Sequence, residues 1–187
     1  AHEALPEKIW EPACGTGNIV SVLRDAGRDV FASDAEMQGC EESCMLDFLS
    51  PDAVKIASDM VTEAIVTNPP FDRLSDGWVE RCLQFAPDVY LLARLQFLEG
   101  SSPWRRTVLE KSGLRRGYVF RDRLPMMHRK GWTGPRASSR MAFAWFCWRR
   151  GWRGQTSVKR ISWKDPGPAL SPPGSKLPRG YCRQTPD

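Results

Sequence analysis

"EPACGTGN", residues 11–18, joins two apolar runs of different period. The run before it, KIWEPAC at 8–14, is short and predicts a buried strand. The run after it, GNIVSVLRDAG at 17–27, has apolar residues at helical spacing and ends in a glycine, so it predicts a helix. Gly15 and Gly17 let the backbone approach a ligand closely, and the start of the helix offers free N–H groups. We therefore expect a strand, a ligand-binding turn and a helix, with an ordinary strand-to-helix turn as the alternative.

Strands and helices continue to alternate through the first half of the chain. The expected strands lie at 29–34, 44–49, 63–68 and 88–95, and the expected helices lie at 51–60, 75–86 and 103–113. This order favours an α/β fold, in which right-handed crossovers build a mostly parallel sheet. Two further strands, at 114–125 and 141–150, have no helix between them. They predict an antiparallel hairpin that closes a seven-stranded sheet.

Length and composition bound the domain organisation. The chain has 187 residues, which suggests one domain, assigned to 1–164. Residues 165–187 are rich in Pro, Gly and Ser and predict a flexible tail. No apolar run approaches the roughly 18 residues of a membrane span, and no signal peptide is visible. The six cysteines lack the spacing of a zinc site, so we expect no metal, and reduced thiols in a cytoplasmic protein.

Charge is distributed unevenly along the chain. Residues 1–100 hold 7 Lys and Arg against 18 Asp and Glu, whereas residues 101–160 hold 16 against 2. A basic half of this kind favours a polyanionic partner such as nucleic acid, with a solvated basic face as the alternative. The loop at 126–140 mixes charge with a stacking ring, which suits a sugar-phosphate backbone and an unstacked base. Its candidate contacts are His128, Arg129, Lys130, Trp132, Arg136 and Arg140.

"IVTNPPFDRL", residues 65–74, ends an apolar run in a rigid turn. Two consecutive prolines cannot continue a helix or a sheet ladder, so the turn is stiff. It holds two acceptors, the side-chain carbonyl of Asn68 and the backbone carbonyl of Pro69, beside the ring of Phe71. Such fixed acceptors can bind the two N–H groups of a planar amine and favour the geometry of an attacking nitrogen.

These motifs together resemble a known family of enzymes. Glu-x-x-x-Gly-x-Gly at 11–17, an acid at Asp34 after the second strand, and Asn-Pro-Pro-Phe at 68–71 resemble the amino-group methyltransferases that use S-adenosylmethionine, most closely the DNA adenine-N6 type. The resemblance covers roughly residues 8–100. It implies a Rossmann-like class I methyltransferase sheet, into which the hairpin at 114–150 also fits.

The resemblance implies a role for each matching residue. Glu11, Ala13, Gly15 and Gly17 would line the methionine half of the cofactor, Asp34 would bind its ribose, and Asp47 would face the adenine amine with Phe48 packed nearby. Asn68, Pro69, Pro70 and Phe71 would form the catalytic pocket. The implied reaction moves a methyl group from S-adenosylmethionine to the N6 amine of an adenine flipped out of DNA. It needs no metal.

Other substrates and another class of function stay open from the sequence. Related motifs occur in methyltransferases of RNA adenine and of protein glutamine. A non-catalytic nucleic-acid-binding module on the same fold is the alternative of a different class. We expect no separate recognition domain from this sequence, so the loop at 126–140, the tail or a partner chain would have to recognise the target.

Overall fold

Eight strands form one mixed sheet in the order β3-β2-β1-β4-β5-β7-β6-β8. The computed structural model describes residues 3–70, 77–99, 102–125 and 140–165, and the sheet is counted within these ranges. The strands are β1 (Lys8–Glu11), β2 (Asp29–Asp34), β3 (Ser43–Met45), β4 (Ala64–Thr67), β5 (Asp88–Arg94), β6 (Leu114–Phe120), β7 (Phe143–Arg149) and β8 (Ser157–Ile161). β1 to β5 are parallel to one another, whereas β7 is antiparallel to both of its neighbours.

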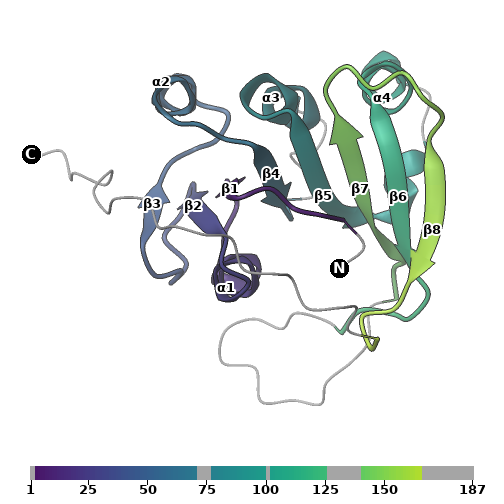
Figure 1. Ribbon diagram of the computed structural model, residues 1–187, viewed down its shortest axis with the longest axis horizontal. Helices are drawn as coiled ribbons and strands as arrows, with labels where there is room; N and C mark the ends of the chain where they lie inside the picture. Colours follow the sequence, from purple (N-terminus) through teal and green to yellow (C-terminus); the bar gives the residue numbers. More distant parts are fainter. Residues whose placement is uncertain (1–2, 71–76, 100–101, 126–139, 166–187) are drawn as a thin grey trace, which may run out of the picture.

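Helices cover both faces of the sheet. They are α1 (Asn18–Asp25), α2 (Pro51–Asp59), α3 (Trp78–Phe85) and α4 (Pro103–Arg106), which a short π-helix, Thr107–Lys111, extends; a 3₁₀ turn, Leu95–Leu98, follows β5. Figure 1 shows α2 and α3 on one side of the strands and α1 on the other. The α/β, Rossmann-like class expected from the sequence is therefore observed.

Alternate residues of the strands form two apolar clusters, one on each face. Trp10 and Ile65 pack with α3 in the larger cluster, whereas Ile9 and Val66 pack with α1 in the other. This alternation follows from the two-residue period of a strand. Because β4 is buried on both faces, its run reads as continuously apolar, and this signal made the strand predictable.

The eighth strand corrects the expectation of seven strands ending in a hairpin. β6 and β7 do pair in antiparallel fashion, but β8 adds to the free edge of β6, parallel to it, with Gly117 opposite Val158. β8 reads SVKRI and is exposed along most of its length. Its sequence therefore carries no buried face to reveal it, and it is a strand because β6 offers an open edge.

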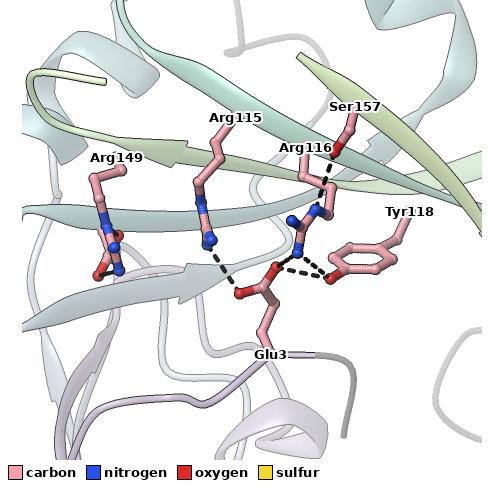
Figure 2. A network of polar contacts seen from close by, with 7 residues as sticks. Glu3, Arg115, Arg116, Tyr118, Arg149 and Ser157 are labelled. Carbon is pink, nitrogen blue, oxygen red and sulfur yellow. Dashed lines mark hydrogen bonds and ion pairs between the residues drawn. The ribbon is translucent and has the colours of Figure 1, made fainter. Parts of the chain in front are cut away.

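Glu3 fastens the N-terminal segment to β6. Its carboxylate accepts hydrogen bonds from Arg115 (2.9 Å), Arg116 (2.6 Å) and the Tyr118 hydroxyl (2.7 Å), as Figure 2 shows. These contacts hold the pKa of Glu3 below its usual value, although partial burial opposes them. The segment that leads into β1 is therefore tied to the opposite half of the sheet.

Two findings bear on the expected cellular setting. No helix in the described part of the chain combines the length and the apolar content that crossing a membrane requires. Cys14, Cys40, Cys82 and Cys147 are buried free thiols, as expected.

Candidate functional site

The candidate site lies where the strand order of the sheet reverses. The chain runs outward from β1 through β2 to β3, and then returns to the other side of β1 as β4. In open parallel sheets, ligands bind at such a switch point, in the crevice beyond the carboxyl ends of the strands. Glu11 ends β1, Asp34 ends β2 and Asn68 follows β4. The topology therefore brings these three predicted residues to one edge of the sheet.

The glycine turn between β1 and α1 needs both of its glycines. Gly15 and Gly17 have φ of 53° and 84°, a left-handed conformation that side chains disfavour. A Cβ on Gly17 would lie 3.0 Å from the Cys40 sulfur. Gly17 is also the N-cap residue of α1, where no side chain caps the helix. The first N–H groups of α1 therefore lack a side-chain acceptor, as in an anion-binding helix start.

Hydrogen bonds tie the glycine turn to the acids on either side. Gly15 donates its N–H to Asp34 Oδ2 over 2.8 Å, and Glu36 donates its N–H to Asp34 Oδ1 over 3.1 Å. Ala13 donates its N–H to Glu11 Oε1 over 3.1 Å. The structure therefore brings the predicted Glu11, Ala13, Gly15 and Asp34 into one connected group.

Glu11 is the strongest electrostatic feature of this group. Its side chain is fully buried, and burial raises the pKa of its carboxyl to about 8, with a smaller upward contribution from Asp34. The nearby Thr67 hydroxyl and the Ala13 N–H lower the pKa only in part. Glu11 Oε2 has no hydrogen-bond partner in the described structure. Burial therefore favours the protonated form of this carboxyl.

Asp47 and Phe48 follow β3 and lie beside the end of β2. The N–H of Leu46 donates to the Asp34 carbonyl over 2.7 Å, which fixes this proximity. Asp47 is exposed, and its Oδ1 accepts the Leu49 N–H in a local turn. The Phe48 ring is 1% exposed and packs in the core against Trp78 and other aromatic rings. Their contacts with the cofactor adenine stay predictions.

The Asn-Pro-Pro turn begins directly at the end of β4. Asn68 is exposed, Pro69 is buried and Pro70 is exposed. The exposed amide thus stands at the carboxyl edge of the sheet on a strand that neighbours β1. Phe71 lies outside the described residues, so its predicted stacking role stays a prediction.

The predicted nucleic-acid loop lies mostly outside the described residues. This applies to His128, Arg129, Lys130, Trp132 and Arg136. Arg140 is described and exposed, three residues before β7. Because Phe143 at the start of β7 pairs with Arg94 at the end of β5, Arg140 lies near the same edge of the sheet as Asn68.

Several arginines of the basic half serve the fold itself. Arg149 forms a two-point ion pair with Asp88, at 2.8 and 2.9 Å, and Arg115 and Arg116 bind Glu3 (Figure 2). Arg105 lies over the Phe97 ring and donates to the carbonyls of Phe97 and Glu99. The charge excess of this half therefore overstates the number of groups that are available to a polyanion.

Sequence reasoning missed two residues that shape the site. Thr67 is fully buried beside Glu11 and immediately precedes Asn68, and Cys40 is the side chain against which Gly17 packs. Threonine is common in strands, so its presence in β4 gave no signal. Cys40 lies far from Gly17 in the sequence, and only the fold brings them together.

Comparison with known proteins finds similarity in structure alone. No family model matches the chain, and no curated protein sequence matches it. A chain from a type I restriction-modification system, studied for complex assembly and conformational transition, matches with a TM-score of 0.52 and 14% identity over 91% of this chain and 44% of its own length. A modification subunit of a putative type I restriction enzyme from Vibrio vulnificus YJ016 matches with a TM-score of 0.48 and 14% identity, over 84% of this chain and 43% of its own length. The type IIG restriction endonuclease BpuSI matches with a TM-score of 0.48 and 16% identity, over 81% of this chain and 23% of its own length.

The first of these matches shows a shared fold. This chain spans less than half the length of all three solved chains. The likeness therefore concerns the α/β unit described above.

Proposed function

We propose that this chain is an S-adenosylmethionine-dependent methyltransferase that methylates the N6 amine of adenine in DNA. One observation carries the proposal. The Asn68 amide and the rigid Pro69-Pro70 turn follow β4, next to the glycine turn that follows β1, and both lie at the switch point of the sheet. The proposed cofactor loop and the proposed amine acceptors would thus lie at the same end of the sheet.

The described residues fit a cofactor such as S-adenosylmethionine, which carries an ammonium group, a carboxylate and a positively charged sulfonium. The buried, unpartnered Glu11 Oε2 suits an ammonium group, and the uncapped start of α1 suits a carboxylate. Asp34 stands at the end of the second strand, where related folds bind ribose hydroxyls. When bound, S-adenosylmethionine would supply an electrophilic methyl group on its sulfonium sulfur.

The chain's own residues would position the amine rather than activate it covalently. An exocyclic amine on an aromatic ring is a weak nucleophile because its lone pair is delocalised. Asn68 Oδ1 and the Pro69 carbonyl would accept its two N–H groups and hold the nitrogen lone pair toward the methyl group. The two prolines restrict the turn, so these acceptors need little reorganisation during the reaction. Phe71 would stack on the flipped base.

DNA is the proposed polyanion because basic and aromatic side chains gather near the same edge of the sheet. Arg123 follows β6, and the Trp163 indole donates to the Arg123 carbonyl over 3.1 Å, whereas Arg121 and Lys164 form ion pairs with Asp165 and Asp122. Together with Arg140 and the loop at 126–140, Arg123 would contact phosphates around the flipped base. The match to a type I restriction-modification chain motivates DNA as the substrate and a partner chain for target recognition.

Nucleoside mass spectrometry tests the proposal. The full chain is incubated with methyl-deuterated S-adenosylmethionine and, separately, with unmethylated DNA, with RNA and with a protein mixture. Labelled N6-methyladenine in DNA alone is the expected result. Label in RNA adenine or in protein glutamine would show that the substrate is RNA or protein rather than DNA. Cofactor binding without label in any of the three would favour a binding module.

A further inference from the structure

Two buried polar groups at the ends of the paired strands β1 and β4 lack a hydrogen bond of normal geometry in the described structure. Glu11 Oε2 at the end of β1 and Thr67 Oγ1 at the end of β4 both lack a partner in the described structure, and both side chains are fully buried. They are close enough for Thr67 to lower the pKa of Glu11, yet no bond of good geometry joins them. Unpaired polar groups at such depth are rare and destabilising, so they point to a role.

Burial is the main reason why the pKa of the Glu11 carboxyl is raised. The groups that act on this pKa are Asp34 from β2, which raises it, and the Thr67 hydroxyl and the Ala13 N–H, which lower it. Among the described residues no basic side chain contributes to its pKa, which burial raises to about 8. The negative form would therefore be stabilised by a cation that a ligand brings.

Thr67 links this carboxyl to the catalytic turn. β1 and β4 are paired, with Trp10 opposite Ile65, and Thr67 is bonded directly to Asn68. A hydrogen bond made by the Thr67 side chain would therefore restrict the orientation of the peptide bond between Thr67 and Asn68. A threonine hydroxyl donates one hydrogen bond, and a carboxylate accepts it far more strongly than a neutral carboxyl does.

We propose that Thr67 is a positioning residue for Asn68: when a cationic amino group binds beside Glu11, the Thr67 hydroxyl donates a hydrogen bond to the resulting carboxylate and fixes the Asn68 peptide. The proton of Glu11 passes to solvent in this step. The inference rests on the proposed function, because the cation is the amino group of the cofactor. It makes cofactor binding, proton release and alignment of the catalytic amide one coupled event.

The test compares Thr67→Val, which has the same shape without the hydroxyl, with Thr67→Ser, which keeps the hydroxyl. In wild-type protein, calorimetry of S-adenosylmethionine binding at pH 7 in buffers of different ionisation enthalpy should show about one more proton released than in Glu11→Gln. Thr67→Val should lose roughly tenfold or more in kcat for methyl transfer. The midpoint of its pH profile of kcat, which reports the enzyme with cofactor bound, should rise by about one pH unit, because the carboxylate loses a donor. Thr67→Ser should restore both.

The outcomes separate this inference from the proposed function. A wild-type chain that binds and transfers methyl, with Thr67→Val matching it in kcat and pH profile, overturns the inference alone. A Thr67→Val variant with a lower melting temperature but an unchanged pH profile shows a merely structural role and also overturns it. A wild-type chain that neither binds the cofactor nor transfers methyl fails the proposed function, and this inference falls with it.

Discussion

The backbone N–H of Gly15 lies 2.8 Å from Asp34 Oδ2, so a single hydrogen bond joins the glycine turn after β1 to the end of β2. The two residues are 19 positions apart in the chain. Because the same carboxylate also accepts the Glu36 N–H, its position is set by two backbone donors. Asp34 is thereby held at the crevice in a fixed orientation.

Asp34→Ala should weaken cofactor binding about 10-fold to 100-fold, because it removes both a ribose acceptor and the bond that shapes the glycine turn. Calorimetry with S-adenosylmethionine measures the dissociation constant. Asp59→Asn, at the exposed end of α2, is the matched control and should bind as the wild type does. Unchanged affinity in Asp34→Ala would show that Asp34 does not contribute to cofactor binding.

Gly17→Ala should destabilise the chain by about 2 to 4 kcal/mol for two reasons. Alanine disfavours the left-handed backbone conformation of this position, and its Cβ would lie too close to the Cys40 sulfur. Gly39→Ala is a close control, since Gly39 also has a positive φ, 97°, but open space where its Cβ would lie. It should cost about 1 kcal/mol. Urea unfolding gives both values, and equal losses would show that the contact with Cys40 is unimportant.

Glu11→Gln should stabilise the chain at neutral pH and leave it nearly unchanged at pH 4. The folded pKa of about 8 lies above the ordinary value of 4.5, so the folded state keeps a proton that the unfolded state releases between these pH values. Stability of the wild type therefore falls as pH rises through this window, by roughly 3 kcal/mol at pH 7. Glutamine carries no such proton. Urea unfolding at both pH values measures the difference.

The control for this change is Glu41→Gln, an exposed acid, which should show no pH-dependent gain. Equal pH dependence in wild type and Glu11→Gln would show that Glu11 ionises normally. The stabilising change should also weaken S-adenosylmethionine binding, since an amide carries no charge for the ammonium group. A gain in stability with a loss of binding is typical of functional sites.

Arg129→Ala combined with Lys130→Ala should weaken DNA binding and reduce the slope of log affinity against log salt by about 1 to 2. Arg105→Ala is the control, because its guanidinium already donates to the carbonyls of Phe97 and Glu99. It should leave the slope unchanged. Fluorescence anisotropy with a labelled duplex over a series of salt concentrations measures both. An unchanged slope in the double variant would place the DNA contacts elsewhere.

Local sequence signals predicted the parts of the fold that local physics determines. The Gly15 and Gly17 turn, the apolar β4 and the stiff prolines after Asn68 are visible without any tertiary contact. β8 was missed because its pairing with β6, rather than its own composition, makes it a strand. The state of Glu11 was missed for a similar reason. An acid at the end of a strand becomes a neutral buried carboxyl only when neighbouring strands and α3 exclude water from it.

The basic half of the chain also has properties that local sequence signals cannot predict. Net charge indicated a polyanion partner, but it could not show that Arg115 and Arg116 bind Glu3, which is more than a hundred residues away in the chain. Pairing of this kind depends on where the fold places each side chain. The candidate site is more predictable than the charged surface because its residues follow the ends of predictable strands.

The most direct test of the central claim compares wild-type protein with Asn68→Ala in the same labelled-methyl assay on unmethylated DNA. The account predicts labelled N6-methyladenine from the wild type, and a loss of roughly 100-fold or more in the variant, because one of the two amine acceptors is gone. Calorimetry should show S-adenosylmethionine binding to both proteins with similar affinity. Equal methylation by the two proteins would contradict the claim that the Asn68 turn carries the reaction.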